Sequence, residues 1–349
     1  MVVKNYEKNY EKDINMIEES ALSNRKRDKV KIGQLFPYLA LIIIIAIIPL
    51  FTQSSYYLHN FILTLIYIII CVSFRFIVIS GQFPLAHMVF MGIGGYSSAV
   101  LAIQLGWSPW LTMPLGALLA MGIGILIGFP FARLRALYYA LVSFFFGTGM
   151  IEVIKAFGRY TGGYGGLARI PGIPGLISAN KVPYYYFILG ITIICLLILY
   201  RFEHSRIGTN LKAIDQSHLV ASSIGINEAR YRVLALAIGC FFAGLAGAIY
   251  AHYNYVLSPA TFNMSSTLWI VMYVLVGGLG SFAGPIVGTI VLFLVPQFYT
   301  DLRTIVPYIS AFLMLAVVFL IPDGIASLPR LVKLRLEAIR KSKGNSNVV

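Results

Sequence analysis

The chain has 349 residues, of which 58% are hydrophobic and only 11% are charged, and its formal net charge is +14. Soluble globular proteins carry about 25% charged residues, so this composition excludes an ordinary soluble domain and indicates a protein surrounded by lipid. The Lys and Arg residues are grouped in a few segments rather than along one exposed face, which argues against a nucleic-acid-binding protein.

Long uncharged segments define the fold class. Residues 35–51 and 184–200 contain no charge and approach the roughly 20 residues that a helix needs to cross a bilayer. The sequence lacks the alternation of a lipid-facing β-barrel, so helices remain the way to satisfy the backbone in lipid. We expect an all-α, polytopic transmembrane helical bundle. Ten spans are predicted, over residues 35–54, 57–79, 88–105, 108–131, 138–157, 183–200, 233–254, 267–279, 284–298 and 305–322.

Basic clusters set the expected orientation. Residues 1–33 hold eight Lys and Arg, residues 201–232 hold five, and the tail from 330 holds six. The positive-inside rule places these regions in the cytoplasm, and an even number of spans agrees, because it puts both termini on one side. We expect a multi-pass protein of the plasma or inner membrane. Its parts are a polar cytoplasmic arm (1–33), a transmembrane domain (34–325) with a cytoplasmic loop (201–232), and a basic cytoplasmic tail (326–349).

Two Gly- and Pro-containing segments interrupt the apolar pattern, at residues 81–87 and 277–285. Irregular backbone at membrane depth occurs where it is buried in protein or lines a cavity, and paired interruptions indicate a translocation path. Glycines that only permit close helix packing explain the same pattern equally well. Candidate path residues, including one acid discussed next, are Gly81, His87, Gly94, Gly95, Glu152, Gly277, Gly278, Gly280 and Pro285.

Few charges fall inside the predicted spans, where each costs a few kcal/mol. Arg75 is expected either to extend to the interface as an anchor or to serve a functional role. Glu152 and Lys155 are three residues apart on one helix face, so they either neutralise each other or line a polar path near the outer mouth. A proton- or sodium-coupled carrier usually has more intramembrane acids, so the energy for transport is expected to come from elsewhere.

Motifs of catalysis and metal binding are missing from the sequence. There is no GxxxxGK[ST] phosphate loop, no HExxH and no GxSxG, and the Cys and His residues have no metal-ligand spacing. We therefore predict no catalytic residue, no metal site and no cofactor in this chain, and we do not expect an enzyme.

The cytoplasmic loop contains two short helix-compatible pieces, 209–214 and 218–224. Asp215 or Ser217 is a plausible N-cap between them, and Gly225 stands where a helix end is expected. So short a loop cannot cover all its apolar residues, so it is expected to occupy a groove on a partner or to lie on lipid headgroups. These apolar residues are Leu211, Ile214, Leu219, Val220 and Ile224.

An ordered series of motifs resembles the permeases of branched-chain amino acid ABC importers. It comprises RIGTNLKAID (206–215), ASSIGIN (221–227), AGLAGA (243–248) and GGLGS (277–281) followed by Gly284-Pro285. The segment TGGYGG (161–166) with Ile170-Pro171 is more similar to the LivM-like member of the usual pair than to the LivH-like one. The resemblance extends over residues 35–325.

The resemblance implies three kinds of protein partner: a second, LivH-like permease, two cytosolic ABC ATPase subunits that bind ATP and Mg²⁺, and an extracytoplasmic solute-binding protein. Membrane lipid is the further partner that the composition indicates. It also implies that the loop holds a coupling helix that docks on the ATPase. His218 and Val220 depart from the family pattern there, which weakens a specific ion pair with the ATPase. The expected coupling residues are Gly208, Lys212, Asp215, Ala221, Gly225 and Asn227.

The implied substrate is a branched-chain or related small neutral amino acid. Two other functions stay open: an autonomous secondary carrier or channel, and an ABC permease for a sugar, nucleoside, urea or amide. The residues that contact substrate, the pairing of like or unlike permeases and the role of the amino-terminal arm are also left open by the sequence.

Overall fold

The computed structural model describes residues 54–134, 136–177 and 181–298 and a few isolated positions. Contacts divide the chain into two units, Met1–Thr52 and Gln53–Val349, and the second is described here. The predicted arm (1–33), the tail (326–349) and the predicted spans 35–54 and 305–322 lie wholly or largely outside the described residues.

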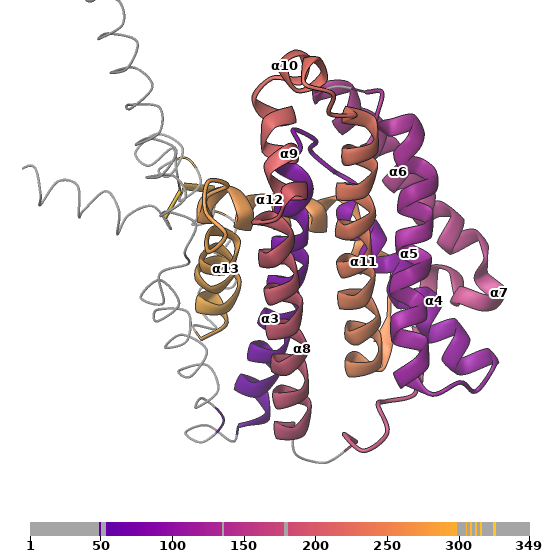
Figure 1. Cartoon of the computed structure of the whole chain (residues 1–349). Helices are drawn as coiled ribbons and strands as arrows, with labels where there is room; N and C mark the ends of the chain where they lie inside the picture. The colour runs from indigo at the N-terminus through magenta and orange to yellow at the C-terminus, as the bar shows by residue number, and fades with distance from the viewer. Residues whose placement is uncertain are drawn as a thin grey trace, which may run out of the picture. The chain divides into compact units, whose positions relative to one another are not determined.

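Helices dominate the described residues (Figure 1). Five of these helices are long and apolar enough to cross a membrane, which establishes an all-α membrane protein but not ten spans. These five are α3 (Ser55–Val78), α5 (Pro109–Phe131), α6 (Ala136–Ala156), α8 (Val182–Glu203) and α11 (Glu228–Asn254), and the next longest helix is α4 (His87–Gln104). The shorter helices are α7 (Gly158–Thr161), α9 (Arg206–Gln216), α10 (His218–Ser223), α12 (Met264–Gly277) and α13 (Gly284–Thr289).

The remaining elements are short. α13 continues as a π-helix over Ile290–Leu294 and a 3₁₀ turn over Val295–Phe298, and further 3₁₀ turns span Gly163–Gly165 and Pro259–Phe262. Two strands, β1 (Leu167–Ala168) and β2 (Val256–Leu257), pair antiparallel, with Leu167 opposite Leu257. They join the loop after α7 to the end of α11.

Small residues let α11 pack tightly against α4 and α5 in the core. A Cβ atom on Gly94 would overlap the backbone of Gly244, and one on Gly247 would overlap the carbonyl of Met91. A Cβ on Gly95 would lie 2.9 Å from the Gly247 carbonyl oxygen. Gly94 and Gly95 therefore allow close helix contact, as small residues do in membrane bundles.

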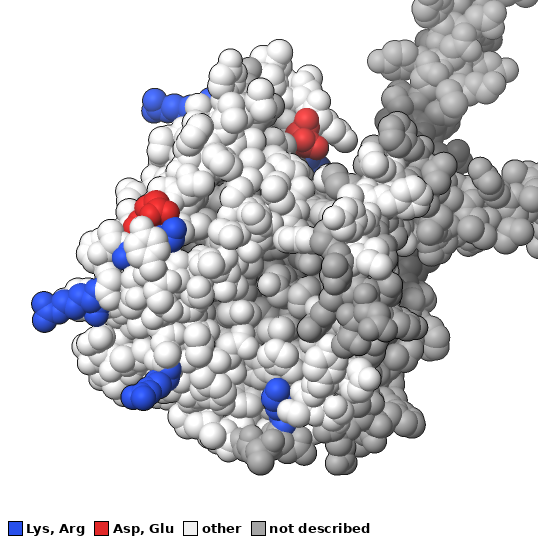
Figure 2. Space-filling model, turned by 180° about the vertical axis from the view of Figure 1, so that it is seen from behind, with Lys and Arg blue, Asp and Glu red and all other residues white. Residues whose placement is uncertain are grey.

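Large apolar side chains cover much of the outer surface. Leu126 is 74% exposed, Leu137 67% and Phe145 66%. Figure 2 shows one face on which the charged side chains are few and separated. Apolar exposure on this scale is far beyond that of a soluble monomer, so lipid covers this surface.

Candidate functional site

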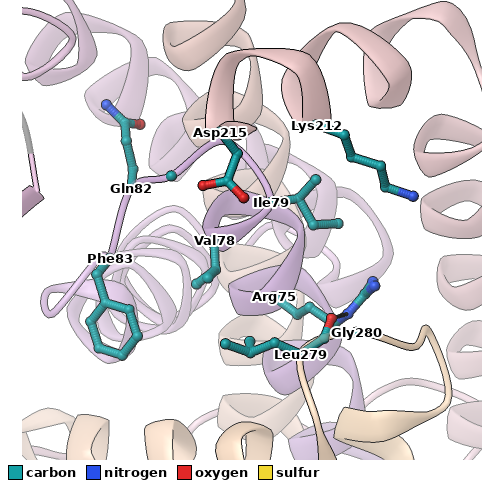
Figure 3. A pocket seen from close by; sticks show the side chains of 10 residues that line it. Arg75, Val78, Ile79, Gln82, Phe83, Lys212, Asp215, Leu279 and Gly280 are labelled. Carbon is teal, nitrogen blue, oxygen red and sulfur yellow. Dashed lines mark hydrogen bonds between the residues drawn. The ribbon is translucent and has the colours of Figure 1, made fainter. Parts of the chain in front are cut away.

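The two interrupted segments and the loop 201–232 meet at one cavity of about 440 Å³. Gly81 and Gly280, predicted for the translocation path, line it together with Lys212 and Asp215, predicted for coupling. Figure 3 shows Asp215 directed toward the loop that carries Gln82, with Lys212 extending to the other side. The lining residues are Arg75, Val78, Ile79, Gly81, Gln82, Phe83, Lys212, Asp215, Leu279 and Gly280.

The first interrupted segment turns sharply at Gly81, whose φ of 76° lies in the left-handed region that favours glycine. The neighbouring Gln82 is buried, and its Oε1 has no hydrogen-bond partner within the described residues. Asp215 stands at the exposed mouth of the cavity. Partial burial raises the pKa of its carboxyl group above the ordinary value of 3.8, and the charge of Arg232 opposes this rise.

A buried group of charges lies beside the cavity, and we call it the Arg75 cluster: Arg75, Glu203, Lys212 and the carbonyl of Leu279. The Arg75 guanidinium donates to both carboxylate oxygens of Glu203, over 2.5 and 3.1 Å. Its Nε–H donates to the carbonyl oxygen of Leu279 at 2.8 Å. Lys212 Nζ donates to Glu203 Oε1 at 3.1 Å. The cluster therefore joins α3, α8, α9 and the second interrupted segment.

Burial distinguishes the members of the cluster. The side chains of Arg75 and Glu203 are 3% and 5% exposed, whereas Lys212 is 48% exposed. The expectation that Arg75 extends to the interface as an anchor is wrong, because its charge is neutralised inside the bundle. Sequence reasoning did not single out Glu203. The available signal was the one acid of α8, at its end and close to Arg201, and the one Arg in the apolar sequence of α3.

The second interrupted segment is a tight hairpin between α12 and α13. A Cβ atom on Gly277 would overlap the carbonyl of Gly284, and one on Gly288 would overlap the carbonyl of Tyr273. Pro285 is buried in the first turn of α13, where its missing N–H costs nothing. Gly280 has no neighbour that a Cβ would meet within 4 Å. The ends of this segment are therefore fixed by close backbone packing, whereas its middle, at Gly280, has free space beside the cavity.

Gly278 links the end of α12 to the open part of this hairpin. Its φ of 107° lies in the region that side chains rarely adopt. The backbone of Gly278 also lies against Gly324, with no room for a Cβ on that residue. Substitution at Gly278 would therefore disturb the hairpin by backbone strain.

The loop 201–232 contains α9 followed by α10, which lie together at one end of the described bundle (Figure 1). Ser205 caps α9 and Ser217 caps α10, so Asp215 lies inside α9 and is not a cap. A Cβ atom on Gly208 would overlap the carbonyl of Glu203, which keeps α9 close to the end of α8. Asn227 caps α11, its side chain accepting from the N–H of Arg230 at 3.1 Å.

The apolar residues of the loop divide into two groups. Leu211 and Ile214 of α9 are buried, as is Ala221 of α10. On α10 and just after it, three apolar side chains stand in the open, and we call them the α10 patch: Leu219 (70% exposed), Val220 (62%) and Ile224 (69%). Gly225 follows with φ of 84° and turns the chain toward α11.

Other predicted path residues lie away from the cavity. His87 is fully buried at the start of α4, with Nε2 2.9 Å from Ser73 Oγ. Glu152 is 61% exposed and pairs with Lys155 at 2.6 Å, so these two charges do neutralise each other. Within the described ranges, no group of three His, Cys, Asp or Glu side chains is placed to hold a metal ion.

Comparisons with known proteins identify the family. Residues 56–322 match the family described as branched-chain amino acid transport system / permease component. The high-affinity branched-chain amino acid transport system permease protein LivM of Escherichia coli (strain K12) is 26% identical over 295 residues, covering 77% of this chain and 69% of that protein. Its Salmonella typhimurium counterpart is 25% identical with the same coverage.

A more distant similarity points the same way. The probable branched-chain amino acid transport permease protein LivM of Methanocaldococcus jannaschii is 21% identical over 231 residues, covering 61% of this chain and 67% of that protein. No solved structure matches the chain. Because the family match covers most of the sequence, the chain belongs to the permease components of branched-chain amino acid transport systems and is a LivM-like member.

Proposed function

We propose that the chain is the LivM-like translocating subunit of an ATP-driven importer for branched-chain or related small neutral amino acids. One observation carries this proposal: the α10 patch is exposed at the end of the bundle where α9 lines the cavity between both interrupted segments. The helix pair α9 and α10 thus connects an exposed surface suited to a partner with a cavity between the interrupted segments.

The proposed topology has about ten spans with both termini in the cytoplasm. Its support is the grouping of Lys and Arg in residues 1–33, 201–232 and beyond 330. In this orientation α9, α10 and the cavity mouth face the cytoplasm. The loop from Gly162 to Ile173 and the β1–β2 pair then face outward, where a solute-binding protein delivers its cargo.

The proposed energy source lies on partner subunits: two cytosolic ATPases hold ATP and Mg²⁺, and a second, LivH-like permease completes the path. This chain contributes a docking helix and two alternative packings of its helices. ATP can shift the balance between those packings only through its different affinity for the two states of the ATPase pair. Docking therefore has to move α9.

The character of the cavity supports an amino acid as cargo. Val78, Ile79 and Phe83 supply apolar walls. The charges in and beside the cavity balance, because the positive Arg75 and Lys212 are opposed by the negative Glu203 and Asp215. Such a balance suits a zwitterion with an apolar side chain better than an ion of one sign. The balance also allows an amide, so the choice among small neutral cargoes falls to the solute-binding protein.

The test is docking and uptake by a double variant, Leu219→Asp with Ile224→Asp. We expect the ATPase to stop co-purifying, because two carboxylates in an apolar contact cannot be desolvated without a partner. ATP-dependent uptake of labelled leucine by the assembled importer in proteoliposomes should fall with it. Thr209→Asp, which adds a single carboxylate on the exposed side of α9, is the control for added surface charge.

Two results would overturn the proposal. If the double variant keeps both the ATPase and normal uptake, α10 is not the docking helix. If the purified chain alone takes up leucine without ATP or partners, it is an autonomous carrier.

A further inference from the structure

The proposed function requires a route from α9 to the interior of the membrane, and the Arg75 cluster has the geometry of one. We propose that Arg75 is a positioning residue that transmits the movement of α9, through Glu203, to the interrupted segment at Leu279. This inference rests on the proposed function, because it explains how docking at α10 reaches the cavity.

The first step is the attachment of α9 to Glu203. Only two residues separate Glu203, the last of α8, from Arg206, the first of α9. α9 contacts Glu203 twice: Gly208 packs against its carbonyl, and Lys212 donates to its carboxylate at 3.1 Å. A tilt of α9 therefore displaces the carboxylate of Glu203.

The second step is the attachment of Glu203 to Leu279. The Arg75 guanidinium is a rigid planar fork, and it holds Glu203 with its two terminal nitrogens and Leu279 with Nε. When the Glu203 carboxylate is displaced, the Arg75 guanidinium rotates with it. That rotation moves the Leu279 carbonyl or breaks its hydrogen bond to Arg75. Leu279 and Gly280 line the cavity, so this movement changes its shape.

Burial decides which bond of the cluster yields first. Arg75 and Glu203 are almost wholly enclosed, and a buried charge without its partner is strongly unfavourable. Lys212 is half exposed, so water can replace its bond to Glu203. The Arg75–Glu203 pair therefore moves as one body, and the bond between Lys212 and Glu203 is the one that forms and breaks as α9 moves.

The alternative explanation is that the Arg75–Glu203 ion pair only stabilises the fold. Arg75→Lys separates the two readings, because a lysine keeps the positive charge beside Glu203 but has no fork to hold Glu203 and Leu279 together. A purely stabilising pair predicts less protein with unchanged coupling. A transmitting residue predicts normal assembly with loss of coupling.

The measurement is the number of leucine molecules imported per ATP hydrolysed by the complete importer in proteoliposomes. For Arg75→Lys we expect ATPase co-purification and ATP hydrolysis within about twofold of wild type and uptake per ATP reduced about tenfold, a usual size for coupling between sites. Lys155→Met removes the exposed Glu152–Lys155 pair and should leave the ratio unchanged.

A wild-type ratio in Arg75→Lys overturns the inference. If that variant does not accumulate, Lys212→Met replaces it, since its side chain is half exposed and its loss leaves the buried pair intact. A wild-type ratio in Lys212→Met then overturns the inference. ATP-dependent uptake by the wild-type assembly establishes the proposed function separately, and uptake without ATP would contradict both proposals.

Discussion

Asp215 Oδ1 lies 3.0 Å from the position that a Cβ atom would take on Gly81. α9 thus lies directly against the first interrupted segment, at the residue where that segment turns. α9 therefore contacts the first interrupted segment through Asp215, and it is connected to the second through the Arg75 cluster.

Gly81→Ala tests this contact. The left-handed φ of 76° costs a side chain about 1–2 kcal/mol, and the new methyl group presses on the Asp215 carboxylate. We expect a lower thermal unfolding midpoint and reduced leucine uptake. Gly106→Ala is the matched control, because that glycine also has a left-handed φ, 64°, but no neighbour within 4 Å of an added Cβ. Equal unfolding midpoints for the two variants would refute the contact.

Gly247→Ala tests the packing of α11 against α4. Its Cβ would overlap the carbonyl of Met91, so the two helices must separate, at a cost of about 1–3 kcal/mol. We expect less folded protein in detergent extracts and a lower unfolding midpoint. Gly190→Ala in α8 has open space around it and should behave as wild type. A Gly247 variant as stable as the Gly190 variant would show that α4 and α11 are further apart.

His252→Leu tests the polar contact that joins the loop containing Pro171 to the bundle. The fully buried His252 has Nδ1 2.7 Å from the Pro171 carbonyl and Nε2 2.8 Å from Ser98 Oγ. Leucine leaves the carbonyl unpaired, which costs about 1–3 kcal/mol. We expect faster proteolysis between residues 162 and 177. His252→Gln, which can still donate a hydrogen bond, should be cleaved more slowly, and equal cleavage of wild type and both variants would contradict the assignment.

Asp215→Asn tests the environment of the cavity mouth through pH. The folded protein raises the pKa of Asp215 above 3.8, so it binds more protons than the unfolded chain just above that pH. Stability from this group is therefore lost as pH rises through the folded pKa. The Asn variant lacks that loss, so its unfolding midpoint relative to wild type should be higher at about pH 7 than at about pH 4. If the unfolding midpoints of wild type and the Asn variant differ by the same amount at both pH values, Asp215 is fully solvated.

The lengths of the apolar segments predict the positions of helices, and here the predicted bounds agree closely with the observed ones. The predicted span 57–79 is α3 (Ser55–Val78), and 183–200 lies within α8 (Val182–Glu203). The loop piece 209–214 is the middle of α9, which begins three residues earlier because Ser205 caps it, accepting from the N–H of Ile207. Local signals of this kind depend only on neighbours along the chain.

Long-range pairing could not be predicted in the same way. Arg75 and Glu203 are 128 residues apart, and no period or spacing connects them. Gly94 reads as a small residue in the sequence, but only the fold shows that it meets Gly244. The candidate site was therefore predicted as two separate sets of residues, and the cavity that joins Gly81, Gly280 and Asp215 depends on tertiary packing.

The α10 patch also bears on how the cell handles this chain before assembly. Leu219, Val220 and Ile224 form an apolar surface at the end of a membrane protein, where chaperones and proteases recognise exposed hydrophobic groups. A subunit made without its partner would display this surface continuously, whereas a docked subunit would conceal it. Under the proposed function, the amount of this chain in the membrane should therefore follow the supply of the ATPase that docks on α10.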